Sequence, residues 1–195
     1  NYAPAYYCDI YLLNHVWDST ISRATAWYIV RILWHLEKIY SDAMRKFPTG
    51  VSIITVVKED GAVASMTANS ITSISLSPPL VLVCVGLSRN TLVYIEDSGK
   101  FAINILREGD ERIARHFASE EKERVEQLPV EYEFNYRGTP KLKNGLSFID
   151  CEVVGTHVYG DDVIFVGEVH AAQVEEGKPL VFFEGQYLGL EKDER

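Results

Sequence analysis

Cysteine is scarce in this chain of 195 residues, and the chain contains no run of about 18 consecutive apolar residues. The three cysteines, Cys8, Cys84 and Cys151, are odd in number and form no CxxC pair, so neither a disulfide framework nor a zinc knuckle is expected. This cysteine usage fits a reducing, cytoplasmic environment. We expect no membrane span, and no signal peptide, because a basic segment followed by an apolar one is missing near the N-terminus.

Basic residues are also few: 19 Lys and Arg stand against 28 Asp and Glu, which gives a formal net charge of −9. Nonspecific nucleic-acid binding needs a basic surface that neutralises phosphates, so this class of function is disfavoured. One small phosphate ligand needs only a local cluster of donors and stays open. With 47% hydrophobic and 24% charged residues, the composition is that of a globular protein and excludes global disorder.

The common catalytic motifs are missing: GxGxxG, GxxxxGKS/T, HExxH and GxSxG do not occur. The five histidines have no metal-ligand spacing, so we expect no metal site. His157 and His170 flank a turn at Gly160-Asp161, and a cross-strand contact between them is favoured over a shared metal.

Residues 1–36 differ from the rest of the chain because they hold all three tryptophans and many tyrosines. A helix with an imperfect amphipathic stripe is predicted over residues 25–44. We interpret residues 1–36 as an aromatic-rich extension that packs on the domain or on a partner subunit. A helix lying on a membrane surface is the alternative. Residues 37–195 are expected to form the main domain.

From residue 37 onward the pattern is mostly that of β-strands, after a short helix over residues 37–46 that ends before Pro48. A hairpin is predicted over residues 51–66, with a turn at Glu59-Asp60-Gly61. The run at residues 80–85 is so apolar that both of its faces should be covered. Further strands are predicted at residues 101–105, 148–159, 163–174, 180–183 and 186–190.

Short helices are predicted at residues 90–97 and 111–118, the second capped by Asp110, with a charged helical turn at residues 120–127. Arg137-Gly138-Thr139-Pro140 and Asn144-Gly145 indicate a loop. About seven strands that do not alternate with long helices argue against a doubly wound parallel sheet. The sequence therefore predicts a mainly β fold, an antiparallel barrel with attached helices.

Two segments are candidates for ligand binding. Residues 65–79 are read as a loop rich in Ser, Thr, Asn and Ala, whose hydroxyl and backbone N–H groups can approach a planar ring or a phosphate. The alternative is that these hydroxyls cap their own turns. Gly86-Leu87-Ser88-Arg89-Asn90 follows at the start of a predicted helix, where free N–H groups and an arginine favour an anion.

These segments also carry a family resemblance. Arg45-Lys46-Phe47-Pro48-Thr49-Gly50-Val51, then Met66-Thr67-Ala68-Asn69-Ser70, and later Pro78-Pro79-Leu80 resemble the flavin reductase-like family. Members of this family are the small reductase components of two-component flavin-dependent monooxygenases. Gly160-Asp161, Gly167-Glu168-Val169 and Pro179-Leu180 extend the resemblance over residues 37–190, and residues 1–36 fall outside it.

The resemblance implies an FMN-binding split β-barrel that forms a homodimer, with the flavin near the subunit interface. By position, the implied flavin contacts are Thr67, Ala68, Asn69, Ser70, Thr72, Ser73, Leu87, Ser88, Arg89 and Ser119, with Ser88 and Arg89 on the phosphate side. The implied nicotinamide contacts are Asp162, Gly185 and Tyr187. Asp162 is a departure, since the family often has Gly-Asp-His where this chain has Gly160-Asp161-Asp162.

The implied activity is that of an NAD(P)H:flavin oxidoreductase. FMN is the expected flavin, with FAD as the alternative, and NADH or NADPH is the electron donor. Because the cofactor carries the chemistry, no catalytic side chain is required, in agreement with the missing motifs. A monooxygenase would receive the reduced flavin. The alternatives are a flavoprotein similar to pyridoxamine-phosphate oxidase, and a non-enzymatic FMN-binding protein that relays electrons.

Overall fold

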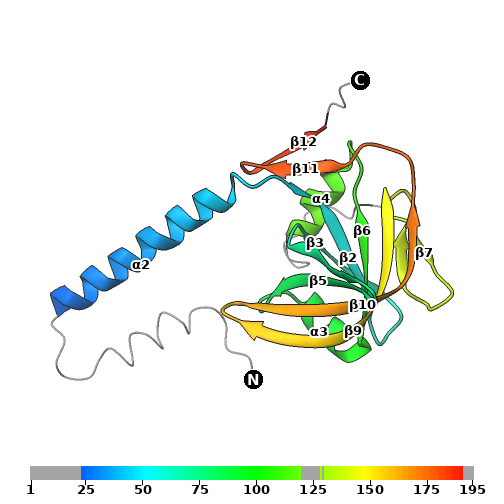
Figure 1. Ribbon diagram of the computed structural model, residues 1–195, viewed down its shortest axis with the longest axis horizontal. Helices are drawn as coiled ribbons and strands as arrows, with labels where there is room; N and C mark the ends of the chain where they lie inside the picture. Colours follow the sequence, from blue (N-terminus) through cyan, green and yellow to red (C-terminus); the bar gives the residue numbers. More distant parts are fainter. Residues whose placement is uncertain (1–22, 120–127, 129, 191–195) are drawn as a thin grey trace.

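The strands assemble into one large antiparallel sheet in the computed structural model, which describes residues 23–119, 128 and 130–190, with side chains from residue 31 onward (Figure 1). The order in this sheet is β3-β2-β6-β9-β10-β5-β4. Its members are β2 (Ser52–Val57), β3 (Val63–Ala68), β4 (Ile71–Leu76), β5 (Pro79–Gly86), β6 (Lys100–Ile105), β9 (Ser147–Tyr159) and β10 (Asp162–Val174). All of its neighbours pair antiparallel, as predicted.

Two small sheets and three helices complete the described part of the chain. One small sheet holds β1 (Thr49–Gly50), β11 (Leu180–Phe183) and β12 (Gln186–Gly189), and the other holds β7 (Tyr132–Phe134) and β8 (Pro140–Leu142). The helices are α2 (Arg23–Met44), α3 (Thr91–Ser98) and α4 (Glu111–Ala118). Gly99 ends α3 in the left-handed conformation, φ 64°, and donates its N–H to the Ile95 carbonyl.

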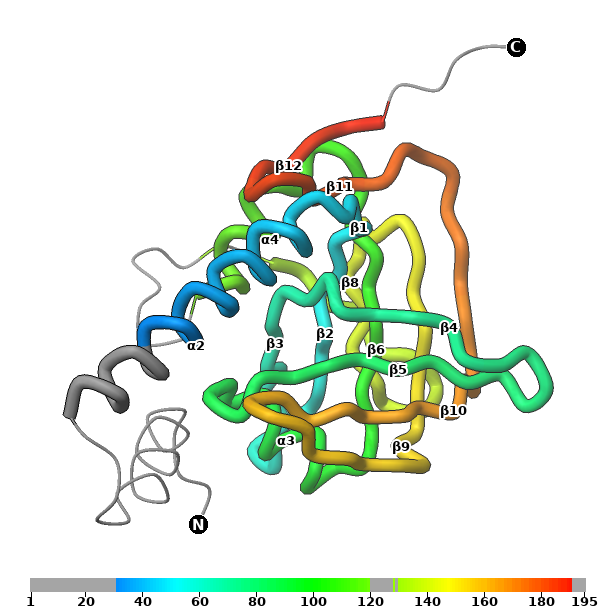
Figure 2. The backbone as a smooth tube through the Cα atoms, turned by 60° about the vertical axis from the view of Figure 1, so that its left-hand side comes forward, coloured from blue at the N-terminus to red at the C-terminus, as the bar shows by residue number. Residues whose placement is uncertain are grey.

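The large sheet is strongly curled. Its two edge strands, β3 and β4, are separated in the chain by Asn69 and Ser70 alone. Such a connection reaches at most about 11 Å between the Cα atoms of Ala68 and Ile71. The two edges therefore meet at this corner, from which β3 and β4 diverge in Figure 2. The Cys84 N–H of β5 donates to the Ser70 carbonyl at the same place, 3.1 Å away.

The core has two parts. The larger part lies inside the curled sheet, where Ile54, Val83, Phe101 and Phe165 are fully buried together with residues of α3. The smaller part lies between the sheet, α4, β8 and β11, and includes Leu106. Along β5 the burial alternates, so the chain covers one face of this strand and leaves the other half-exposed. The prediction that both faces of residues 80–85 are covered is therefore not met within a single chain.

Several predicted elements are confirmed within a residue or two, and others are wrong. The helix at 111–118, the long hairpin of β9 and β10 and the last strand pair lie where the sequence placed them. Residues 65–79 are not a loop, because the end of β3, the whole of β4 and the start of β5 occupy them. The predicted loop at residues 137–140 is the turn of a hairpin formed by β7 and β8, and Pro140 is the first residue of β8. Asp110 begins α4 but accepts the Arg107 N–H rather than capping the helix.

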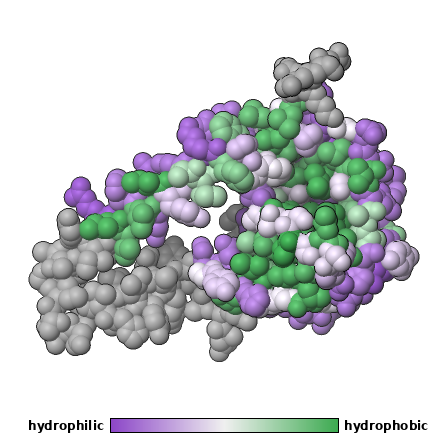
Figure 3. Space-filling view, viewed as in Figure 1, coloured by the Kyte–Doolittle hydropathy of each residue, from purple (hydrophilic) through white to green (hydrophobic). Residues whose placement is uncertain are grey.

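Helix α2 projects away from the body of the molecule (Figure 1). It is one continuous helix, so the separate helix predicted over residues 37–46 is wrong. Its described side chains include exposed apolar groups, among them Trp34 (76% exposed) and Leu36 (61%), and apolar residues are visible along it in Figure 3. No described helix has the length and hydropathy needed to cross a membrane. Residues 1–22 and the turn expected at 120–127 lie outside the described residues.

Candidate functional site

A groove of about 910 Å³ opens where the end of α2 meets the corner between the two sheet edges. Its lining residues come from the end of α2, from β1 and β11, and from β4 and β5. Its lining is mainly apolar or uncharged polar: Tyr40, Ser41, Met44, Phe47, Pro48, Thr49, Gly50, Ser52, Asn69, Ser70, Ile71, Thr72, Leu82, Cys84, Ile105 and Phe182, together with Arg45. A volume of this size holds a cofactor-sized ligand.

Three of the predicted flavin contacts, Asn69, Ser70 and Thr72, line this groove. The Asn69 Nδ2 donates to Thr49 Oγ1 at 3.2 Å, and the Ser70 hydroxyl donates to the Cys84 carbonyl at 3.0 Å. These bonds hold the corner in one arrangement, and Asn69 and Thr72 line the groove together with the apolar residue Leu82. Polar groups of this kind next to apolar ones suit a planar ring with a polar edge.

Other predicted flavin contacts point elsewhere. The Thr67 hydroxyl donates to the Ala114 carbonyl of α4 at 2.7 Å, and Ala68 is 5% exposed in the core. Both residues fix the position of β3. Ser73 is exposed on β4 beyond the residues that line the groove. The groove is lined by the corner residues Asn69 and Ser70 and by the start of β4, so the end of β3 and Ser73 lie outside it.

The predicted phosphate contacts gather around the start of α3. Arg89 and Ser119 line a crevice of about 30 Å³ between β3, α3 and the end of α4. The Arg89 Nη1 donates to the Ala118 carbonyl at 2.8 Å, which uses one of five guanidinium N–H groups. Leu87 donates its N–H to the Asp161 carbonyl, and no side chain caps the first turn of α3. Free N–H groups at a helix start favour an anion.

The three predicted nicotinamide contacts are not brought together within one chain. Asp162 lies opposite Gly86 on β5, where its Oδ1 would be 3.7 Å from a Cβ built on Gly86, and the Arg89 Cγ is equally near that point. Asp162 is therefore beside the predicted phosphate contacts. Gly185 is in the β11–β12 turn next to Arg45, and Tyr187 packs on Phe182 and under the Arg115 guanidinium.

Cys84 lines the groove and is not an activated nucleophile. Burial first, and the Asp162 carboxylate second, raise the pKa of the Cys84 thiol above its ordinary value. Burial and the neighbouring Asp161 charge raise the pKa of Asp162. Cys84 therefore stays a protonated thiol near neutral pH and presents a weakly polar surface to a ligand.

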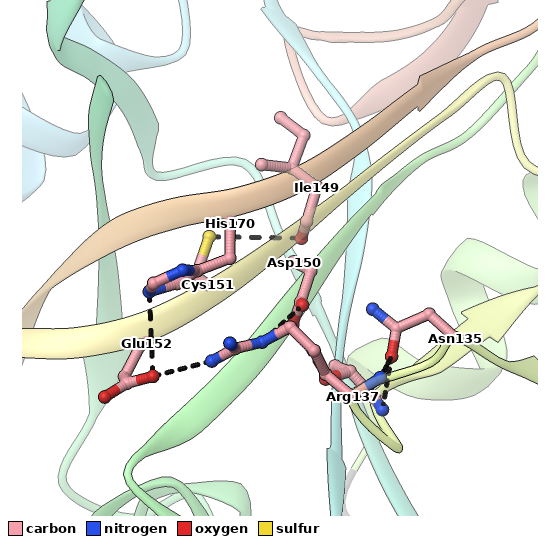
Figure 4. A network of polar contacts seen from close by, with 8 residues as sticks. Asn135, Arg137, Ile149, Asp150, Cys151, Glu152 and His170 are labelled. Carbon is pink, nitrogen blue, oxygen red and sulfur yellow. Dashed lines mark hydrogen bonds and ion pairs between the residues drawn. The ribbon is translucent and has the colours of Figure 1, made fainter. Parts of the chain in front are cut away.

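A second polar cluster lies at the other end of the molecule, between the β7–β8 turn and the strands β9 and β10 (Figure 4). We call it the Arg137 cluster: Arg137, Thr139, Asp150, Glu152 and His170. The Arg137 Nε is 3.0 Å from the fully buried Asp150 Oδ2, and its Nη2 donates to Glu152 at 2.6 Å. The Thr139 hydroxyl donates to Asp150 at 2.7 Å, and His170 Nε2 is 3.6 Å from Glu152. The Arg137 guanidinium forms ion pairs with both carboxylates of the cluster, which indicates a structural role.

The histidine pair predicted to meet across the β9–β10 hairpin does not meet. His157 lies opposite Ile164, whereas His170 follows a register shift and faces Glu152. Among the described residues no group of three His, Cys, Asp or Glu side chains is arranged to hold a metal.

Sequence reasoning missed the α2 side of the groove. Arg45, Phe47, Pro48 and Thr49 line it, and the motif of residues 45–51 contained all of them without a site role being assigned. Leu82 and Cys84 were also missed because their run was interpreted as fully buried. The alternation of buried and half-buried residues along β5 is a property of the assembled sheet, and a uniformly apolar sequence does not reveal it.

The chain is similar in sequence and in fold to several known proteins. Residues 44–191 match the sequence model of the flavin reductase like domain. The chain is 36% identical over 160 residues to an NADH-dependent flavin reductase of a Rhodococcus species, covering 80% of this chain and 86% of that one. It is 32% identical over 155 residues to the reductase subunit HsaB of a flavin-dependent monooxygenase of Rhodococcus jostii, covering 79% and 78%. The solved flavin reductase PheA2 superposes with a TM-score of 0.74 at 38% identity, covering 80% of this chain and 98% of that one.

Proposed function

This chain belongs to the flavin reductase-like family, and we propose that it transfers a hydride from NADH or NADPH to a flavin bound in the groove between α2, β4 and β5. The observation that carries the proposal is the groove of about 910 Å³ that Asn69, Ser70 and Thr72 line. The bound flavin supplies the hydride-accepting chemistry, as cofactors do in such enzymes.

The residues present fit a flavin. The side chains of Ile71, Leu82 and Phe182 supply apolar contact area for a ring, and Asn69 and Thr72 supply polar groups for its edge. Their task is to orient the ring and to exclude water from it, since the protein contributes binding and positioning rather than a nucleophile. We propose FMN as the flavin, with FAD as the alternative.

The phosphate of the flavin is assigned to Ser88, Arg89 and the uncapped start of α3. Its test is Arg89→Ala, which should weaken FMN binding by roughly 1.5–3 kcal/mol, the value of a charge-assisted hydrogen bond. Riboflavin lacks the phosphate, so its dissociation constant should hardly change. An equal loss for FMN and riboflavin would show that Arg89 acts through the end of α4, to which it donates at present.

We propose that the protein is a homodimer with the flavin near the subunit interface, in an incompletely closed, split barrel. Two surfaces support a second copy: the apolar residues exposed along α2, and the outer face of β5, where Leu80 and Leu82 are half-buried. A dimer would also allow Asp162 of one copy to approach Gly185 of the other, which the single chain does not bring together. Light scattering should give about twice the chain mass of 22.1 kDa, and a monomer at micromolar concentration would contradict the dimer.

The remaining assignments follow from the same proposal. Residues 1–36 are proposed as an extension of the family domain, with helix α2 continuing across that boundary. The reduced flavin would be delivered to a monooxygenase component, and the HsaB relative is named as the reductase subunit of a flavin-dependent monooxygenase. The cytoplasmic location stays a prediction.

The experiment that tests the function is anaerobic addition of NADH, and separately of NADPH, to the full chain with FMN. We expect the flavin absorbance to bleach as the nicotinamide is oxidised, catalytically with excess FMN. Tight FMN binding without nicotinamide oxidation would favour an electron-relay protein. Oxidation of pyridoxamine phosphate in place of NADH would favour the pyridoxamine-phosphate-oxidase class.

A further inference from the structure

The lining of the groove contains one charged side chain among the residues that the structure describes, Arg45. Every other lining residue is apolar or uncharged. An anionic ligand in this groove would therefore find its only side-chain countercharge at this position. Nicotinamide dinucleotides carry a diphosphate, whereas the flavin ring that we place against Asn69 and Thr72 needs no cation.

The backbone fixes Arg45 at one end of the groove. Its N–H donates to the Ser41 carbonyl in the last turn of α2, 3.0 Å away, and its own carbonyl accepts the Glu184 N–H at 3.1 Å. Gly185 follows in the β11–β12 turn with φ 80°, and a Cβ built on it would be 3.5 Å from Arg45 Nη2. The guanidinium thus lies against the turn that the sequence resemblance assigns to the nicotinamide donor.

The charge of Arg45 is also unused. In the described part of the chain, its guanidinium has no hydrogen-bond or ion-pair partner, whereas the neighbouring Lys46 forms an ion pair with Glu184. Two adjacent exposed cations therefore differ in one respect: Lys46 is neutralised within the protein, and Arg45 is available to a ligand. A guanidinium can bind a diphosphate through two parallel hydrogen bonds, which suits this role better than an ammonium.

We propose that Arg45 binds the diphosphate of the nicotinamide dinucleotide and positions the donor over the groove. This inference rests on the proposed function and assigns the donor a binding residue of its own. The flavin phosphate is a less suitable ligand for Arg45, because we assign it to Ser88 and Arg89, and Arg89 lines a separate crevice bordered by α4. Arg45 forms no bond to a reacting atom, so it is a positioning residue.

The test compares Arg45→Gln with the matched control Lys46→Gln in the full chain. ADP-ribose, which carries the diphosphate without the nicotinamide, is titrated by calorimetry, so that binding is measured independently of turnover. We expect Arg45→Gln to weaken ADP-ribose binding and to raise the KM for the dinucleotide by roughly ten- to hundredfold, the effect of losing a charge-assisted pair. Lys46→Gln should change neither value, and Arg45→Lys should restore part of the loss.

A donor without phosphates separates positioning from general damage. N-benzyl dihydronicotinamide should be oxidised by Arg45→Gln at the wild-type rate, and the FMN dissociation constant should be unchanged. An equal loss with both donors, weaker binding of FMN but not riboflavin, or unchanged ADP-ribose affinity would each overturn the proposal. If the wild-type chain binds ADP-ribose through Arg45 but oxidises no donor, the proposed function fails while the diphosphate site stands.

Discussion

The two ends of this molecule use charge in opposite ways. In the Arg137 cluster the guanidinium lies between a buried carboxylate and an exposed one, and Thr139 satisfies the remaining oxygen of Asp150. In the groove beside α2, Arg45 is the one charged side chain of the lining and has no partner among the described residues. One arginine holds a hairpin against the sheet, and the other is free to bind a ligand.

The difference gives a criterion for this fold: a charged side chain that is paired within the protein has a structural role, and an unpaired one in a groove is available for ligand binding. A buried carboxylate must be paired, because an isolated charge in the interior costs several kcal/mol. The hydrogen bond from Arg137 lowers the pKa of Glu152, as expected for a pair that is formed in the folded state. An unpaired cation in a large, mostly apolar groove has no such structural task.

The largest effect is expected at Asp150. Asp150→Ala leaves the Arg137 guanidinium and the Thr139 hydroxyl without their buried partner, so the free energy of unfolding should fall by roughly 3 kcal/mol. Denaturant unfolding measures this loss. Glu152→Gln is the control, because Glu152 is half-exposed and its loss should matter much less. Equal effects of both substitutions would show that the buried pair does not hold the hairpin.

A somewhat smaller effect is expected at Gly167, in the middle of β10. A Cβ at this position would be 2.7 Å from Phe101 Cζ and 2.8 Å from Cys151 Cβ, and both neighbours are fully buried. Gly167→Ala should therefore lower the free energy of unfolding by about 1–3 kcal/mol through overpacking.

Gly155→Ala is the matched control on the same hairpin, since its Cβ would meet Val166 at an ordinary 3.5 Å. Unfolding curves in denaturant should separate the two variants clearly. A Gly167→Ala protein as stable as the wild type would mean that Phe101 can move aside without cost.

Much of the fold could be predicted from the sequence, because strand periodicity and turn residues are local signals. The β9–β10 hairpin is an example: its apolar residues alternate and Gly160 marks the turn with φ 61°. Residues 65–79 show where prediction from local sequence signals fails. Ser and Thr residues are as typical of turns as of an exposed edge strand, and only pairing with β5 makes residues 71–76 a strand.

The candidate site was predictable in part for a related reason. Asn69 and Ser70 could be assigned from the motif, because they form the corner itself and must line whatever opens there. Arg45 and Phe182 could not, since they are far apart in sequence and are brought together by the pairing of β1 with β11. The position of Asp162 beside Gly86 follows from the register of β10 with β5, which the sequence alone does not reveal.

The smallest expected effect is a change in the reactivity of the Cys84 thiol in the groove. The Asp162 charge contributes to the raised pKa of Cys84, so Asp162→Asn should lower that pKa and increase the thiolate fraction at a given pH. Alkylation of Cys84 by iodoacetamide at mildly alkaline pH should become about two- to fivefold faster, as a screened charge interaction allows. Asp161→Asn is the control, because Asp161 acts on Asp162 rather than on Cys84. Equal rates in both variants would contradict the placement of Asp162.

The most direct test of the central claim, that the groove holds the flavin, is protection of Cys84 from alkylation by FMN. Cys84 is partly exposed in the groove, whereas Cys151 is buried and burial raises its pKa to about 12, so Cys151 is an internal reference. Mass spectrometry of the two peptides gives both rates on the native protein. We predict that saturating FMN suppresses alkylation of Cys84 and leaves Cys151 unreactive throughout. An alkylation rate of Cys84 that is unchanged by saturating FMN would contradict the account.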